Sequence, residues 1–244
     1  MLLKCVNTGS QNGNCYILEN ESEALILDAG VRYRDALKTI NYNISKVAGV
    51  LLTHEHGDHI KCFKDLIRAG IKCYGSDELQ ESLRTITGEL ITGLQEKKAY
   101  RIGNFSVILM KVPHDGTDCV AYIIEFGEEK LLYATDFSYL PYRLTSWKIN
   151  HWLIECNHIQ DLVDKSEAKY EHSIRGHSEL STVKEIISVN KTPEMRNIIL
   201  CHLSEGWSDE KRMKVEIQET AGKWVRVEVA HSGLELSLSR YPWE

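Results

Sequence analysis

One short stretch constrains the fold of this chain more than any other. Residues 49–63 read GVLLTHEHGDHIKCF, an apolar run followed at once by three histidines, a glutamate and an aspartate. His54 and His56 are two residues apart, so on an extended or turning backbone both imidazoles can reach one ion, whereas on a helix they would diverge. Asp58 and His59 follow where a helix should begin and offer ligands for a second ion. The stretch predicts half of a two-metal site, and a polar surface loop is the less favoured alternative.

The other ligands of such a site must come from elsewhere in the chain. A histidine or an aspartate directly follows an apolar run at three later places: His114 after VILMKVP, Asp136 after KLLYAT and His202 after NIILC. Because each follows a predicted strand, as the first cluster does, we expect these three side chains to complete the coordination of the two ions.

Composition places the chain among ordinary globular proteins. It has 244 residues, 43% apolar and 26% charged, which favours a single domain over residues 1–244. No apolar run is long enough to cross a membrane and no signal peptide is recognisable, so we expect a cytoplasmic protein without a membrane partner. Seven dispersed cysteines without a CxxC pair predict small buried residues rather than disulfides. The net charge of -6 argues against broad electrostatic capture of long nucleic acid.

Strand patterns and helix patterns alternate along the chain, which predicts an α/β fold. The first helix after the histidine cluster should run from Ile60 to a stop at Gly70, and Ser76 should cap the next helix. Asn12-Gly13 predicts a tight hairpin turn between two strands. Strands are expected at 2–8, 15–20, 24–30, 47–54, 71–75, 105–112, 120–126, 130–136, 151–156, 197–203 and 224–230, and further helices at 77–86, 157–165, 179–190 and 209–220.

Taken together, these motifs resemble the metallo-β-lactamase-fold hydrolases over essentially the whole chain. The resemblance rests on LILDAG, on THEHGDH and on the three later residues in the expected order. It implies a four-layer αββα sandwich with two metal ions. It also implies that His54, His56 and His114 hold one ion, that Asp58, His59 and His202 hold the other, that Asp136 bridges them, and that Asp28 is a buried aspartate orienting a ligand. A plain turn residue in Asp-Ala-Gly is the alternative for Asp28.

Two residues beyond Asp136 indicate which branch of this superfamily the chain resembles. Glu155 ends the apolar run HWLIE, and His177 lies in IRGHSE just before a predicted helix. The pair is similar to that of the YycJ-like and tRNase Z-like phosphodiesterases. A histidine held by a carboxylate keeps one tautomer and can protonate a leaving alkoxide, with Asp58 helping to orient the attacking hydroxide. A strand-end surface acid and a loop histidine are the alternative. The continuations GHSEL and HLSEGWS depart from the YycJ-like pattern, so the substrate is open.

The sequence therefore predicts a dinuclear metal-dependent phosphodiesterase acting on single-stranded nucleic acid or on a cyclic nucleotide, such as a phage or bacterial defence signal. A thioester or lactone hydrolase on the same metals and a non-catalytic, metal-stabilised binding protein are the alternatives. Imidazole-rich ligation favours Zn²⁺, with Mn²⁺ as the second option. The expected partner is a small or single-stranded phosphodiester, and a homodimer is an option. Stacking of a base on an aromatic ring competes with simple packing for Tyr139, Tyr142, Trp147 and Trp207.

Overall fold

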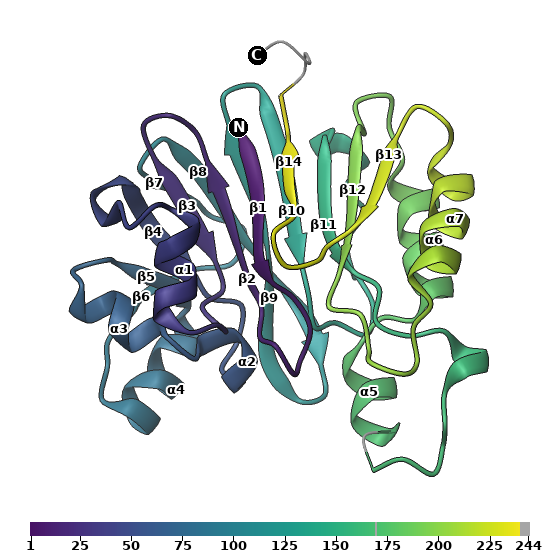
Figure 1. Ribbon diagram of the computed structural model, residues 1–244, viewed down its shortest axis with the longest axis horizontal. Coiled ribbons are helices and arrows are strands. Elements are labelled where there is room, and N and C mark those ends of the chain that lie inside the picture. Colours follow the sequence, from purple (N-terminus) through teal and green to yellow (C-terminus); the bar gives the residue numbers. More distant parts are fainter. Residues whose placement is uncertain (169, 240–244) are drawn as a thin grey trace. The chain divides into compact units, whose positions relative to one another are not determined.

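The computed structural model describes residues 1–168 and 170–239 (Figure 1). The chain divides into two compact units, which are treated separately below. The first consists of residues 1–110 together with the described residues from His231 onward, and the second consists of residues 111–230. The expectation of one domain over residues 1–244 is not tested by this division and stays a prediction. No helix in the described part of the chain combines the length and the apolarity that a membrane span requires.

The first unit is built on a seven-stranded sheet of order β14-β1-β2-β3-β4-β5-β6. Pairing is antiparallel from β14 to β3 and parallel from β3 to β6, so the carboxyl ends of β3 and β4 lie at the same edge. Its elements are β1 (Leu2–Asn7), β2 (Cys15–Glu19), β3 (Ala24–Leu27), α1 (Tyr33–Thr39), η1 (Ile44–Lys46), β4 (Val47–Leu51), α2 (Gly57–Ile60), α3 (Phe63–Arg68), β5 (Cys73–Ser76), α4 (Asp77–Thr87), β6 (Thr92–Leu94) and β14 (Glu235–Ser237).

A second seven-stranded sheet has the order β13-β12-β11-β10-β9-β8-β7. Strands β10 to β13 are parallel to one another, so their carboxyl ends also share one edge. Its elements and the associated helices are β7 (Ala99–Ile102), β8 (Phe105–His114), β9 (Thr117–Phe126), β10 (Glu129–Ala134), η2 (Thr145–Trp147), β11 (His151–Glu155), η3 (Gln160–Leu162), α5 (Tyr170–Gly176), α6 (Leu180–Asn190), β12 (Asn197–Cys201), α7 (Glu210–Ala221) and β13 (Arg226–Val229). The division into units falls within β8.

Most predicted elements are present, and the α/β class is confirmed. Several of the expected strands are buried along their whole length, and the Ser76 hydroxyl accepts the Leu79 N–H at 2.9 Å, as a helix cap does. All seven cysteines are buried and free, in line with the prediction of small buried residues. The predicted tight turn at Asn12-Gly13 is wrong in length, because β1 and β2 pair as a hairpin but are joined by residues 8–14.

The helix predicted at 157–165 is wrong, and only the short turn η3 forms there. The backbone of this segment has partners outside it. Asn157 N–H donates to Ser178 O at 2.9 Å, and Ile159 N–H donates to Trp207 O at 2.9 Å. A helix would need the carbonyls of Asn157 and His158 for the N–H groups of residues 161 and 162, but these carbonyls accept from Ser204 N–H at 2.7 Å and from Leu180 N–H at 2.9 Å, so tertiary contacts take the place of the helix.

The single helix expected after the histidine cluster is divided into α2 and α3. The carbonyl of Asp58 accepts the backbone N–H of Asn14 at 2.7 Å, while the Cys62 N–H donates to Ala29 O at 2.8 Å. In a continuous helix the Cys62 N–H would donate to Asp58 O, but here both groups have partners outside the helix. The interruption ties the ligand-bearing turn α2 to two loops of the same unit.

Candidate metal centre

Three predicted site residues adopt a backbone conformation that is uncommon outside glycine. Asp28 directly follows β3, His202 directly follows β12, and Asp136 follows β10 after one intervening residue. The φ angles of Asp28, Asp136 and His202 are 57°, 53° and 52°. Left-handed conformations of this kind are costly and cluster at functional sites, because the surrounding structure must enforce them. Here they turn each side chain back at the carboxyl end of a strand.

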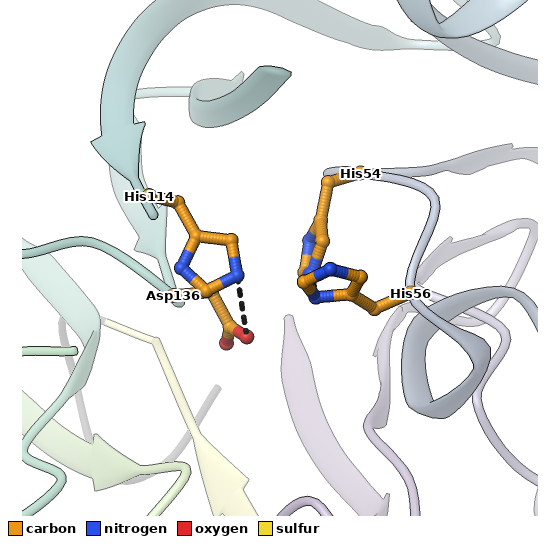
Figure 2. Close-up of side chains that lie close together, drawn as sticks. All are labelled: His54, His56, His114 and Asp136. Carbon is orange, nitrogen blue, oxygen red and sulfur yellow. Dashed lines mark hydrogen bonds and ion pairs between the residues drawn. The ribbon is translucent and has the colours of Figure 1, made fainter. Parts of the chain in front are cut away.

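The first unit contributes two neighbouring imidazoles directly after β4. His54 Nε2 lies 3.0 Å from His56 Nδ1, and Figure 2 shows the two rings beside each other on the loop that leads into α2. His54 is fully buried, and its Nδ1 lies 3.0 Å from the Thr53 hydroxyl. The two ring nitrogens that face each other are close enough to bind one ion together.

Asp28 is fully buried and holds the third histidine of this cluster. Its Oδ2 lies 2.7 Å from His59 Nδ1, and its Oδ1 accepts the Thr53 N–H at 2.8 Å. This contact engages Nδ1 of His59, while the other ring nitrogen, Nε2, lies 3.4 Å from Asp58 Oδ2. A carboxylate on the far nitrogen of a ligating histidine is the usual arrangement in metal sites, because it sets the tautomer and the ring orientation.

Asn14 belongs to the same group of contacts, and the sequence analysis missed it. Its side chain is fully buried, with Nδ2 3.3 Å from Asp58 Oδ2 and 3.1 Å from His59 Nε2. Its Oδ1 accepts the Gly9 N–H at 2.9 Å, which fixes the amide orientation. The only sequence signal is an amide directly before a strand, and this signal is common in turns.

Two glycines allow the loop of Asn14 to come this close. A Cβ on Gly13 would lie 1.8 Å from Gly30 O, and a Cβ on Gly30 would lie 1.6 Å from Asp58 O. No side chain can be accommodated at either position without moving the backbone. The Asn-Gly pair read as a turn signal therefore serves close packing of residues 8–14 on the ligand-bearing turn.

Replacing Asn14 by alanine is expected to weaken metal binding about tenfold, since partners that orient metal ligands are typically worth 10–100-fold in affinity. Competition against a chromophoric chelator measures the effect. Asn20→Ala is the matched control, because Asn20 also holds a loop of this unit through its Oδ1 but contacts no predicted ligand. Equal affinities of Asn14→Ala and the unaltered chain would contradict the assignment of Asn14.

In the second unit, Asp136 lies between two imidazoles. Its Oδ2 is 3.7 Å from His114 Nε2, an ion pair drawn as a dashed line in Figure 2, and its Oδ1 is 3.4 Å from His202 Nε2. His114 Nδ1 lies 2.8 Å from the Gly176 carbonyl, to which it donates. A Cβ on Gly176 would lie 2.9 Å from His114 Nδ1, so this glycine permits the close approach of the ring.

Glu155 is the centre of the polar contacts in this unit. Its Oε1 lies 2.8 Å from Nδ1 of His177 and 2.8 Å from Nδ1 of His202. Its Oε2 accepts the backbone N–H of Ser178 at 2.9 Å and that of Phe137 at 3.3 Å. The sequence predicts the pairing of Glu155 with His177, whereas the contact of Glu155 with His202 appears only in the structure. One carboxylate thus engages Nδ1 of both histidines and orients their rings.

Burial and charge act in opposite directions on this pair. Burial by itself raises the pKa of Glu155, but the His177 charge and the hydrogen bonds from both histidines outweigh it and hold that pKa well below its ordinary value. Burial lowers the pKa of His177, and the carboxylate of Glu155 more than compensates, so the pKa of His177 is raised. The pair favours a carboxylate beside a protonated imidazole.

Buried side chains of the second unit lie close enough together to hold a metal ion. In the second unit, one ligand atom from each of Asp136, Glu155, His177 and His202 lies within 4.8 Å of the others, and all four side chains are buried. In both units there are histidines whose Nδ1 is engaged by a carboxylate or a carbonyl and whose Nε2 lies beside an aspartate: His59, His114 and His202. This is the pattern of histidines prepared for a metal ion.

The remaining residues singled out in the sequence lie outside these clusters. Glu55 accepts a hydrogen bond from Ser82 of α4. Trp207 is 1% exposed and donates its indole N–H to Glu167 at 2.8 Å, so it packs in the interior and offers no face to a base. Tyr142 donates to Lys111 O at 2.8 Å, and Tyr139 is exposed.

The chain matches a family model and is similar to several known proteins. Residues 8–153 match the family model of the metallo-beta-lactamase superfamily. The exodeoxyribonuclease YycJ of Bacillus anthracis is 26% identical over 82% of this chain and 81% of its own length. Ribonuclease J 1 of Streptococcus pyogenes is 29% identical over 54% of this chain and 27% of its own length.

Solved structures show the same fold. The metallo-beta-lactamase fold protein YhfI of Bacillus subtilis superposes with a TM-score of 0.75 at 20% identity, over 96% of this chain and 98% of its own. The short form of human tRNase Z gives 0.67 at 15% identity, over 98% and 100%. The predicted four-layer αββα sandwich and the predicted metal-dependent hydrolase acting on ester bonds are thereby confirmed. The chain belongs to the metallo-beta-lactamase superfamily.

Proposed function

We propose that this protein is a dinuclear metal-dependent phosphodiesterase that cleaves single-stranded nucleic acid, with single-stranded DNA ends as the first substrate and cyclic nucleotides as the second. The observation that carries the proposal is the buried pair of Glu155 and His177, joined at 2.8 Å beside two predicted metal ligands. The likeness to an exodeoxyribonuclease over four fifths of both chains supports DNA as the substrate.

The proposed ligands are those expected from the sequence. His54, His56 and His114 would hold one ion; Asp58, His59 and His202 would hold the other; and Asp136 would bridge them. Zn²⁺ suits so many imidazoles, and the two carboxylates keep Mn²⁺ as the alternative. Bound there, the two ions would stabilise charge on the phosphate oxygens and lower the pKa of an attacking water.

The protein's own residues would supply what two cations cannot. A departing alkoxide needs a proton, and His177 carries one on Nε2 because Glu155 engages Nδ1 and raises the pKa of the ring. Asp58 would accept a hydrogen bond from the attacking water and orient it, while the amide of Asn14, 3.3 Å from Asp58 Oδ2, holds that carboxylate in place. Cytoplasmic location is part of the same proposal.

A direct comparison of substrates tests the proposal. The chain is loaded with Zn²⁺ or Mn²⁺ and assayed side by side on single-stranded DNA, single-stranded RNA, a cyclic dinucleotide, a thioester and a lactone. We expect the DNA strand to be shortened fastest and both esters to be poor substrates. Faster cleavage of the thioester or lactone than of any phosphodiester would assign the alternative hydrolase. Tight metal binding without turnover of any substrate would indicate a metal-stabilised binding protein.

A further inference from the structure

A polar cavity lies in the first unit, outside the ligands discussed above. Its volume is about 730 Å³. β1, α1, the first residue after α2, and the segment before β14 contribute to its walls, together with the loop between β1 and β2. Its charged side chains are Lys4, Arg32, Asp35, Lys38, Lys61 and Glu235.

Two of the four basic groups in this wall are neutralised within the protein. Lys4 Nζ lies 2.5 Å from Glu19 Oε2 and 3.9 Å from Glu235 Oε1, and Arg32 Nε donates to Asp35 Oδ2 at 2.8 Å. Glu19 in turn is shared with Lys46. The two acidic residues of the wall, Glu235 and Asp35, thus already pair with Lys4 and Arg32.

Lys38 and Lys61 remain as the positive charges of the cavity. Both side chains are exposed, and no carboxylate within residues 1–168 and 170–239 forms an ion pair with either. Amide side chains from the loop between β1 and β2, Gln11 and Asn12, line the same space. Two ammonium groups with neighbouring amides provide the donors that phosphate oxygens require.

The cavity is built on the same two segments as the ligands of this unit. Asn12 precedes Asn14 by two residues, and Asn14 contacts Asp58 and His59. Lys61 follows His59 by two residues, at the end of α2. A nucleic acid strand bound through Asp58 and His59 would therefore find cationic groups on the continuation of the same loops.

We propose that this cavity binds the backbone phosphates of a single-stranded nucleic acid beside the phosphodiester that is cleaved, through Lys38 and Lys61. The proposal rests on the proposed function for its substrate class. In a chain of net charge -6, such a local site would attract a strand without making the whole surface basic. The contacts are to phosphates, so the site is expected to distinguish strand length rather than base sequence.

Binding of oligothymidylates to the Lys38→Glu/Lys61→Glu variant tests the site. The probe is a fluorescein-labelled 16-mer with phosphorothioate linkages, which keep the charge and resist hydrolysis, and anisotropy is followed over a series of salt concentrations with metal-loaded protein. Loss of two phosphate contacts should lower the salt slope, which is the magnitude of the slope of log binding constant against log salt concentration, by about 1.4. It should also weaken binding about tenfold or more near 0.1 M salt. Lys72→Glu/Lys98→Glu, with exposed lysines of the same unit outside the cavity, is the matched control and should bind nearly normally.

Three results would overturn the proposal: unchanged binding, equal loss in the control variant, or equal loss for a mononucleotide and the 16-mer, which would indicate a nucleotide pocket. Lys38→Glu alone changes a residue of α1 and leaves the sequence of α2 and Lys61 intact, so it should give about half of the slope change and guards against disturbance of the ligand turn. Hydrolysis of bis-p-nitrophenyl phosphate should be unchanged in all variants. That assay reports on the proposed function independently, because the small ester reaches only the reacting groups.

Discussion

Replacing Asp136 by alanine is expected to abolish binding of at least one metal ion and to lower hydrolysis of bis-p-nitrophenyl phosphate by about a thousandfold. The physical reason is that Asp136 lies between His114 Nε2 and His202 Nε2 and is proposed to bridge both ions. Metal catalysis contributes several kcal/mol of transition-state stabilisation, and about 4 kcal/mol corresponds to three orders of magnitude in rate. Metal per chain, measured by elemental mass spectrometry, and the initial rate give the two readouts.

The backbone at Asp136 calls for a second variant. Its φ of 53° disfavours alanine, whereas asparagine tolerates the left-handed region and has nearly the same shape. Asp136→Asn should therefore keep the fold while still losing the bridging charge, metal and activity. His56→Ala provides an independent ligand deletion on the first unit. Full metal content with full activity in Asp136→Asn or His56→Ala would refute the dinuclear mechanism.

Removing His177 should affect catalysis without affecting the metal. His177→Ala is expected to lower the cleavage rate of DNA by about 10²–10⁴-fold, the usual contribution of a positioned general acid. The loss should be much smaller for bis-p-nitrophenyl phosphate, because p-nitrophenolate leaves without needing a proton. The comparison of the two substrates, at unchanged metal content, distinguishes a proton donor from a merely structural residue. His177→Asn keeps a short polar side chain and serves as the conservative control.

Glu155→Gln should combine both kinds of loss. Glu155 contacts Nδ1 of His177 and Nδ1 of His202, so its neutralisation disturbs the proton donor and a proposed ligand together. We expect metal affinity to fall about 10–100-fold and the rate on DNA to fall at least as far as in His177→Ala. The Glu155→Gln/His177→Ala double variant should cleave DNA only slightly more slowly than Glu155→Gln alone, because the effects of residues that act as a unit are not additive. Additive losses, or unchanged metal affinity in Glu155→Gln, would contradict the shared role.

Local pattern was sufficient for most of the architecture and for the residue types of the site. Histidines and aspartates directly after apolar runs predicted where strands end, because a buried strand can place polar side chains outside the core only at its ends. The absence of a helix at 157–165 could not be predicted, because Leu180 and Ser204, distant in sequence, donate to the carbonyls that a helix would need. The division of the helix after the histidine cluster has the same cause in Asn14 and Ala29.

The sequence by itself determined that histidines and aspartates suited to two metal ions occur at strand ends, and that Glu155 and His177 accompany them. Only the tertiary structure decided which partners orient these groups. It brought Asn14 onto Asp58 and His59, and gave Glu155 a second histidine. It also gathered Lys38 and Lys61 around one cavity. The reason is physical: ligand type and strand ends are local properties of the chain, whereas hydrogen-bond partners and unpaired charges depend on which distant segments the fold places together.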